Sequence, residues 1–175
     1  MAAPLREYFL DVVASDVFAY GSEHQDDAID FLGAISAPAG RRRPDWIITN
    51  PPFKVAEAFA LNALTIATEG VALLVRTSWL EGAGRYERLF AHHRPAMVAQ
   101  FVERLPMHRG RWEPNGSTAT SYLWVVWLTS DEIDGSATTE FVHIPPGRRK
   151  ALTRPDDVPR FGAAPADAPL LMAGE

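Results

Sequence analysis

The fold of this chain is indicated most clearly by residues 45–53, which read Asp-Trp-Ile-Ile-Thr-Asn-Pro-Pro-Phe. The β-branched run that ends at Thr49 predicts a short strand. Beyond the two prolines, apolar residues recur at helical spacing from Val55 to Ile66, which predicts a helix. The stretch is therefore expected to form a strand, a rigid turn and a helix in that order.

The turn itself carries chemistry. Proline has a fixed φ and no N–H, and it holds the preceding residue extended, so Asn50 and Pro51 both face restricted conformations. The Asn50 side-chain oxygen and the Pro51 carbonyl can then project as two fixed acceptors, with the flat ring of Phe53 close by. Two acceptors that grip both N–H bonds of a planar amino group favour a localised lone pair and stabilise the positive charge that develops during attack. The alternative is that the prolines only stop a strand.

With these residues, the chain resembles the S-adenosylmethionine-dependent amino methyltransferases, above all the DNA adenine-N6 enzymes, whose catalytic motif is Asn-Pro-Pro-Phe after an apolar strand. The resemblance implies that Asn50 and the Pro51 carbonyl bind the target amine. It also implies that Phe53 stacks on an extruded base and that Pro52 completes the motif.

The resemblance extends upstream of the motif. Residues 11–16 read as a buried strand that ends in a carboxylate, and the resemblance implies that Asp16 binds the cofactor ribose, with Val17 beside the adenine ring. It further implies that Asp30 binds the adenine amino group while Phe31 covers that ring. The competing interpretation is that Asp16 and Asp30 only cap turns.

Further strands are expected downstream. Residues 70–76 are continuously apolar up to Arg76, as in a parallel strand buried on both faces. Residues 81–93 predict a helix, and residues 97–102 and 122–128 predict two more strands. The alternation predicts an α/β, doubly wound, Rossmann-like methyltransferase sheet, mostly parallel, with the last two strands antiparallel at one edge.

One expected element has no counterpart in the sequence. The resemblance places a first strand and a glycine-rich cofactor loop ahead of the strand at residues 11–16, yet residues 1–9 already read as the end of the intervening helix. The missing strand would be central in the sheet, between the second and fourth strands. A start assigned too far downstream, a truncated product, or a partner chain that supplies the strand would each explain this, and the first is favoured.

A basic and aromatic segment lies between the last two predicted strands. Arg109, Arg111 and Trp112 fall in the stretch 106–120, and basic and aromatic side chains of this kind contact phosphates and stack on bases. The segment is therefore a candidate target-binding loop, and an ordinary solvated loop is the alternative. Residues 41–43, all arginine, are read as a charged turn or, less favourably, as a second phosphate contact.

Composition limits the remaining choices. The 175 residues predict one domain, with a methyltransferase-like unit over residues 1–144 and a Pro- and Ala-rich tail over residues 145–175. The chain has no cysteine, so disulfides and thiolate metal sites are excluded, and no metal is expected. Without an apolar stretch long enough to span a bilayer, a soluble cytoplasmic protein is expected.

The expected reaction is methyl transfer from S-adenosylmethionine to adenine N6 in DNA. The net charge of −5 argues only weakly against nucleic acid as the partner. Guanine-N2 transfer to RNA and glutamine-N5 transfer to a protein use the same amino-group chemistry and stay open. So does a truncated, non-catalytic subunit that binds nucleic acid.

Overall fold

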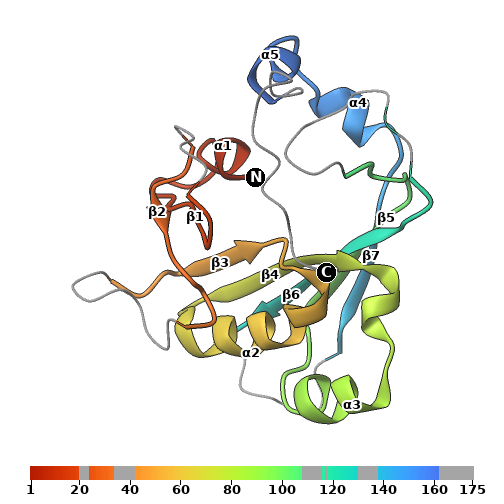
Figure 1. Cartoon of the computed structure of the whole chain (residues 1–175). Helices are drawn as coiled ribbons and strands as arrows, with labels where there is room; N and C mark the ends of the chain where they lie inside the picture. Colours follow the sequence, from red (N-terminus) through yellow and green to blue (C-terminus); the bar gives the residue numbers. More distant parts are fainter. Residues whose placement is uncertain (20–23, 34–41, 108–115, 117, 130–137, 162–175) are drawn as a thin grey trace.

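The larger of two β-sheets has the strand order β3-β4-β6-β5-β7 (Figure 1). The strands are β3 (Trp46–Thr49), β4 (Gly70–Arg76), β5 (Met97–Phe101), β6 (Tyr122–Leu128) and β7 (Glu140–Ile144). β3 pairs in parallel with β4, and β5 with β7, whereas β6 is antiparallel to both of its neighbours, β4 and β5. The computed structural model describes residues 1–19, 24–33, 42–107, 116, 118–129 and 138–161. Over these residues the fold is mixed α/β, with a mostly parallel sheet.

Two expectations about this sheet have different outcomes. β4 is buried from Gly70 to Val75, which confirms a strand enclosed on both faces. The antiparallel pairing of β5 with β6 is also confirmed, but its expected place at the sheet edge is wrong. β6 lies in the centre, and β7, which the sequence did not predict, forms the edge beyond β5. β7 is largely exposed, so it lacks the continuous apolar run that signals a buried strand.

Helix α2 (Ala56–Ile66) follows the motif directly and packs on the sheet. A single 3₁₀ turn, η1 (Phe53–Val55), leads into it, and Figure 1 draws α2 and α3 together below the strands. The buried positions of α2 are Ala56, Ala60, Ala63 and Ile66. Because three of these side chains are methyl groups spaced about one turn apart, the helix backbone can approach the sheet closely.

The core lies between α2 and the central strands β4 and β6. Its largest fully buried side chains come from both strands and from the helical segment after β4: Trp127, Leu73, Leu89, Leu123, Val71, Val75 and Val125. An aromatic cluster closes one end of the core. The ring of Trp79 meets Phe90 and Trp127 edge-on, with centroids 5.6 and 6.5 Å away. Trp79 and Trp127 are both buried in this cluster.

The helix predicted over residues 81–93 is present in shorter form. A 3₁₀ segment, η2 (Thr77–Leu80), precedes α3 (Ala83–Arg85), which continues as a π-helical segment, η3 (Tyr86–Phe90). Arg88 fastens this segment to α2: its Nε lies 2.6 Å from Glu57 Oε1 and its Nη2 3.0 Å from Glu57 Oε2. The hydrogen bonds from Arg88 hold the pKa of the Glu57 carboxyl below its usual value.

The N-terminal residues form a smaller unit. Helix α1 (Ala2–Leu5) is followed by β1 (Ser15–Asp16) and β2 (Asp27–Ala28), which pair in parallel as a separate two-stranded sheet. The expectation of a buried strand over residues 11–16 is wrong, because only two of these residues are in a strand and both are exposed. β1 and β2 have no strand pairing to β3 among the described residues. A strand paired on one side only has little apolar surface to bury.

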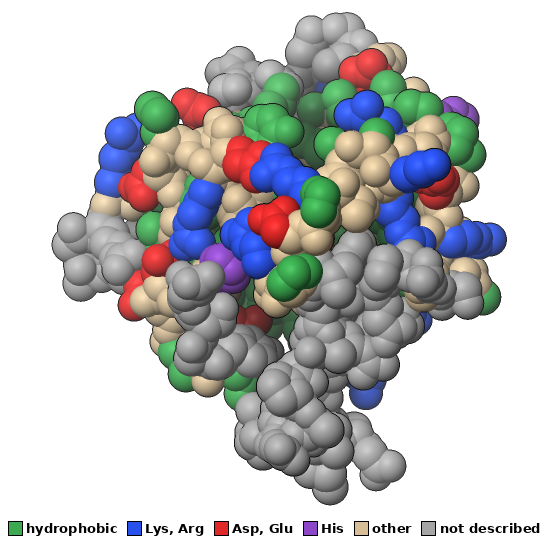
Figure 2. Space-filling model, turned by 90° about the horizontal axis from the view of Figure 1, so that it is seen from above, with side chains coloured by type: hydrophobic (Ala, Val, Ile, Leu, Met, Phe, Trp, Pro, Cys, Tyr) green, Lys and Arg blue, Asp and Glu red, His purple; other side chains and the backbone are tan. Residues whose placement is uncertain are grey.

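The C-terminal part of the described chain packs against this N-terminal unit. Two short helices, α4 (Arg148–Leu152) and α5 (Asp157–Phe161), follow β7, and Figure 1 draws them above the sheet with α1. Arg154 forms two hydrogen bonds to the Glu7 carboxylate, of 2.6 and 2.5 Å. Seen from above, basic and acidic side chains are interspersed on this face (Figure 2).

Candidate functional site

The Asn-Pro-Pro-Phe motif forms the end of β3 and the start of the following turn. Pro51 is buried and anchors the turn, while Asn50 and Phe53 are exposed on either side of it. Pro52 is extended, with φ −57° and ψ 130°, and its carbonyl accepts the N–H of Val55 at 3.1 Å to close the 3₁₀ turn. Strand, rigid turn and helix therefore follow one another as predicted.

The polar groups of the motif make few hydrogen bonds to the residues that the structure describes. Asn50 Nδ2 lies 3.8 Å from the sulfur of Met107, a weak acceptor. Within the described part of the chain, neither Asn50 Oδ1 nor the Pro51 carbonyl has a hydrogen-bond partner. Two acceptor oxygens from adjacent residues, next to a buried proline, can accept the two N–H bonds of one amino group.

The ring of Phe53 has a cation on one face. The guanidinium carbon of Arg76 lies 4.1 Å from the ring centroid, and the ring of Tyr122 lies 6.2 Å away at a tilt of 32°. Arg76 is the last residue of β4 and pairs with Tyr122 across the antiparallel ladder, so their side chains share a face of the sheet. Phe53 is 37 % exposed, which leaves part of its ring accessible.

The same end of the sheet holds a second arginine. Arg104 Nη1 donates to the Ala119 carbonyl at 2.7 Å and to the Ser121 hydroxyl. Ser121 precedes Tyr122, and its carbonyl also accepts both the backbone N–H and the hydroxyl of Thr77, each at 3.1 Å. Residues from β4, from the start of β6 and from the segment after β5 therefore converge beside the motif.

No role was assigned to Arg76 or Arg104 from the sequence, although Arg104 falls among the basic residues that precede Trp112. Arg76 ends a predicted strand on the side of the motif, but nothing in its neighbours along the chain points to Phe53. The signal that could have found it is the register of β4 with β6, which brings Arg76 opposite Tyr122. That register joins segments about 46 residues apart, and loop residues between them do not encode it locally.

The predicted cofactor residues lie on the smaller unit. Asp16 Oδ1 accepts the N–H of Phe18, and Asp30 Oδ1 accepts the N–H of Leu32, both at 3.1 Å. Both carboxylates thus form the turn-capping contacts that the alternative interpretation expected, and both remain exposed. Val17 is exposed as well. Among the described residues, no hydrogen bond, ion pair or ring contact joins these residues to Asn50 or Phe53.

Phe31 is held differently from its neighbours. Its ring stacks on Phe59 of α2 at a centroid distance of 4.9 Å, and its carbonyl accepts Asn62 Nδ2 at 2.6 Å. The segment after β2 is therefore attached to the helix that begins at the Asn-Pro-Pro-Phe motif. No signal in the sequence pointed to these contacts of Phe59 and Asn62 with Phe31, although both residues follow the motif within one helix.

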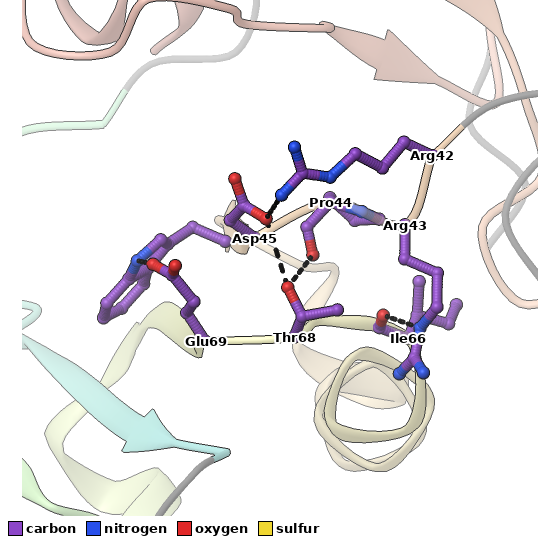
Figure 3. A network of polar contacts seen from close by, with 8 residues as sticks. Arg42, Arg43, Pro44, Asp45, Ile66, Thr68 and Glu69 are labelled. Atoms are coloured by element: carbon purple, nitrogen blue, oxygen red, sulfur yellow. Dashed lines mark hydrogen bonds and ion pairs between the residues drawn. The ribbon is translucent and has the colours of Figure 1, made fainter.

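The arginines before β3 have structural partners (Figure 3). Arg42 Nη2 lies 3.0 Å from Asp45 Oδ1, and Arg43 donates to the carbonyls of Thr65 and Ile66, each at 2.8 Å. Thr68 adds a hydrogen bond to Asp45 at 3.2 Å. These contacts fix the start of β3 to the turn between α2 and β4, which favours the charged-turn interpretation. Arg41 is outside the described residues.

The predicted target-binding loop is largely outside the described residues. This applies to Arg109, Arg111 and Trp112. In the described part of the chain, no group of three or more His, Asp or Glu side chains is arranged to hold a metal ion. None of the helices there is long and apolar enough to cross a bilayer.

Compared with known proteins, the chain matches no protein-family model and no curated protein. The residues at the ends of β3 and β4 are therefore the basis for assigning a function to the chain.

Proposed function

We propose that this chain is an S-adenosylmethionine-dependent methyltransferase that acts on adenine N6 in DNA. The observation that carries the proposal is the pair of acceptors, Asn50 Oδ1 and the Pro51 carbonyl, at the end of β3 with the exposed ring of Phe53 beside them. Catalytic groups are commonly placed at the carboxyl ends of strands in open α/β sheets. The motif therefore lies where catalytic groups are commonly found, and its acceptors suit the proposed reaction.

The chain's own residues have defined parts in this reaction. Asn50 Oδ1 and the Pro51 carbonyl accept the two N–H bonds of the adenine amine, which localises its lone pair and stabilises the developing positive charge. Phe53 stacks on the base after it leaves the duplex, a contact worth about 1–3 kcal/mol. No strong general base is needed, because the methylated nitrogen becomes acidic enough to lose its proton to water.

The residues on the smaller unit fit the cofactor in chemical type. Asp16 and Asp30 present exposed carboxylates suited to ribose hydroxyls and to an adenine amino group. Val17 and Phe31 supply apolar surface next to them. The cofactor would provide the electrophilic methyl group; these residues would bind and orient it.

We further propose that the sheet belongs to a doubly wound, Rossmann-like arrangement completed by another strand. The carbonyl of Asp45 faces β4, because it accepts the N–H of Gly70 at 3.0 Å. Alternate residues of a strand direct their N–H and C=O groups to opposite edges, so those of Trp46 and Ile48 point away from β4. A parallel strand between β1 and β3 would pair these groups.

The separation of the two sheets supports a second candidate function. In the described chain, β1 and β2 are not paired to β3. The proposed cofactor-binding residues, in or after β1 and β2, therefore do not belong to the sheet whose strand β3 leads into Asn50 and Pro51. The chain would then be a non-catalytic methyltransferase-like subunit that binds nucleic acid. Guanine-N2 transfer to RNA and glutamine-N5 transfer to a protein are further alternatives, since the same acceptor pair suits their amino groups.

Radioactive methyl transfer tests the proposal directly. The protein is incubated with methyl-labelled S-adenosylmethionine and with adenine-containing DNA, structured RNA or a glutamine peptide, and the label in each polymer is counted. Asn50→Ala should lower transfer at least about a hundredfold, in line with the loss of one oxyanion-type contact. Gln100→Ala, which removes a carboxamide bonded to the Phe101 carbonyl on β5, is the matched control.

Cofactor binding, measured by calorimetry, separates the two candidates. An enzyme binds S-adenosylmethionine in both the wild type and Asn50→Ala, whereas a non-catalytic subunit binds it in neither. Full activity of Asn50→Ala would refute the role of the amine cradle.

A further inference from the structure

We propose that Arg76 and Arg104 form a phosphate-binding pair, and that the substrate held beside Asn50 and Phe53 is therefore a nucleic-acid strand. This inference rests on the proposed amino methyl transfer and assigns the substrate class of that site. It concerns two residues outside the Asn-Pro-Pro-Phe motif. Neither belongs to the predicted target-binding residues.

The two arginines contact or face neighbouring residues at the start of β6. Arg76 lies opposite Tyr122 in the β4–β6 ladder, with its guanidinium carbon 4.1 Å from the centre of the Phe53 ring. Arg104 is bound through Nη1 to Ser121, the residue before Tyr122, and to Ala119. Because Ser121 and Tyr122 are consecutive, the two arginine side chains are anchored at the same end of the sheet.

Neither guanidinium is neutralised by a carboxylate in the described part of the chain. Six other described arginines do meet acidic side chains: the pairs are Arg6–Asp26, Arg42–Asp45, Arg85–Glu57, Arg88–Glu57, Arg154–Glu7 and Arg160–Asp156. Arg104 instead contacts a carbonyl and a hydroxyl, and Arg76 an aromatic ring. In a chain with a net charge of −5, two exposed cations without acidic partners mark a place for an anion.

The remaining donors suit a phosphodiester. A guanidinium has five N–H donors in a planar fork, and Arg104 uses only Nη1 for its hydrogen bonds to the part of the chain that the structure describes. The guanidinium carbon of Arg76 lies over the Phe53 ring, and a ring face engages none of the N–H donors in an ion pair. Two oxygens of one phosphate can accept two parallel N–H hydrogen bonds from such a guanidinium. If a base stacks on the accessible part of Phe53, the phosphates on either side of that nucleotide lie close to the ring, because they are covalently linked to the base through the sugar.

A protein glutamine would not use this pair. Its side chain is neutral and offers no anion to either guanidinium, and nothing in a glutamine peptide must stack on Phe53. The geometry therefore favours a nucleic acid over a protein substrate for the same amine cradle.

Binding of labelled single-stranded DNA tests the proposal. The probe is a fluorescent oligodeoxynucleotide of mixed, adenine-containing sequence, and fluorescence anisotropy gives its Kd from about 50 to 200 mM salt. Arg76→Gln and Arg104→Gln should each weaken binding about tenfold and lower the slope of log K against log salt by about 0.7. Arg76→Lys and Arg104→Lys retain the charge, so they should restore the slope.

Arg42→Gln is the matched control. It also removes one exposed positive charge, but at the start of β3 where Arg42 already pairs with Asp45. Its Kd and salt slope should equal those of the wild type, and thermal unfolding followed by circular dichroism confirms that every variant is folded. Unchanged DNA binding in both glutamine variants, no DNA binding by the wild type, or transfer only to a glutamine peptide would each overturn the phosphate pair.

The outcomes for the two proposals can be told apart. Arginine-dependent DNA binding without any methyl transfer removes the enzyme and keeps the phosphate pair. Methyl transfer that depends on Asn50 but not on Arg76 or Arg104 keeps the enzyme and removes the pair.

Discussion

The indole of Trp46 lies directly over Gly70, its partner across the β3–β4 pair. A Cβ added to Gly70 would stand 2.5 Å from two carbons of that ring, closer than any ordinary contact. The indole is also held from its other side, since its Nε1 donates to Glu69 Oε2 at 3.2 Å. The strand that carries the amine cradle is therefore packed against β4 through a position that admits only glycine.

Gly70→Ala should accordingly destabilise the protein. The methyl group forces the indole or the strand to move, and overpacking of this kind costs about 1–3 kcal/mol in the free energy of unfolding. Urea denaturation measures the loss. Trp46→Val alone is the control, because Gly70→Ala made in that background no longer meets the indole. If adding Trp46→Val to Gly70→Ala recovers none of the loss, the clash is not its cause.

Two buried tryptophans should respond differently to loss of the indole N–H. Trp127 Nε1 donates to the His93 carbonyl at 2.9 Å, whereas Trp79 Nε1 is buried without a partner among the described residues. Trp127→Phe leaves a carbonyl unpaired and should cost about 1–2 kcal/mol more than Trp79→Phe, which removes an unsatisfied donor. Urea unfolding of both variants compares them at equal loss of ring area. Equal costs would contradict the role of the hydrogen bond.

The Glu57–Arg88 pair should make stability depend on pH. Because Arg88 lowers the pKa of Glu57 in the folded state, the pair contributes stability that is fully present above the unfolded pKa, about 4.3, and is lost as the pH falls through the folded pKa. Glu57→Gln should therefore be less stable than the wild type at pH 7, and the difference should shrink below pH about 4. Thermal unfolding midpoints across this range test it. Glu81→Gln, at an exposed position, is the control and should show no such convergence.

Asn62→Ala should loosen the segment after β2 without unfolding the core. The variant loses the hydrogen bond from Asn62 Nδ2 to the Phe31 carbonyl, so amides of residues 29–33 should exchange with deuterium faster, while those of β4 keep their protection. Thr65→Ala is the matched control on the same helix, since its hydroxyl contacts only the Asn62 carbonyl. Uniformly faster exchange in β4 would show that the contact supports the whole fold rather than this segment.

The local order around the motif was predictable because its causes are local. A β-branched run, two prolines and a 3.6-residue apolar repeat each act over a few residues, and together they determine β3, the turn and α2. β4 was equally clear, since burial on both faces leaves no polar position in the run.

The central place of β6 and the existence of β7 were not predictable in the same way. Strand order depends on pairings between distant segments, and β7 alternates with little burial. The strand over residues 11–16 shows the opposite error. An apolar run is buried only when other elements cover the faces of its sheet, and both residues of β1 are exposed.

The candidate site divides in the same manner. Asn50, Pro51, Pro52 and Phe53 are adjacent, so their chemistry is visible in the sequence. Arg76, Arg104 and Tyr122 reach them only through the register of three strands, which no short motif records.

The position of β6 also limits the order in which the sheet can assemble during synthesis on the ribosome. β5 is made before β6 but touches β4 only through it, since β6 separates the two in the sheet. In a nascent chain that ends near residue 110, β3 can pair with β4, but β5 has no strand to pair with. Its apolar side chains therefore stay exposed to solvent until β6 is made. β6 (Tyr122–Leu128) therefore joins the two halves of the sheet. Just before it emerges from the ribosome, the nascent chain exposes the most apolar strand surface, and chaperones would bind it most at that stage.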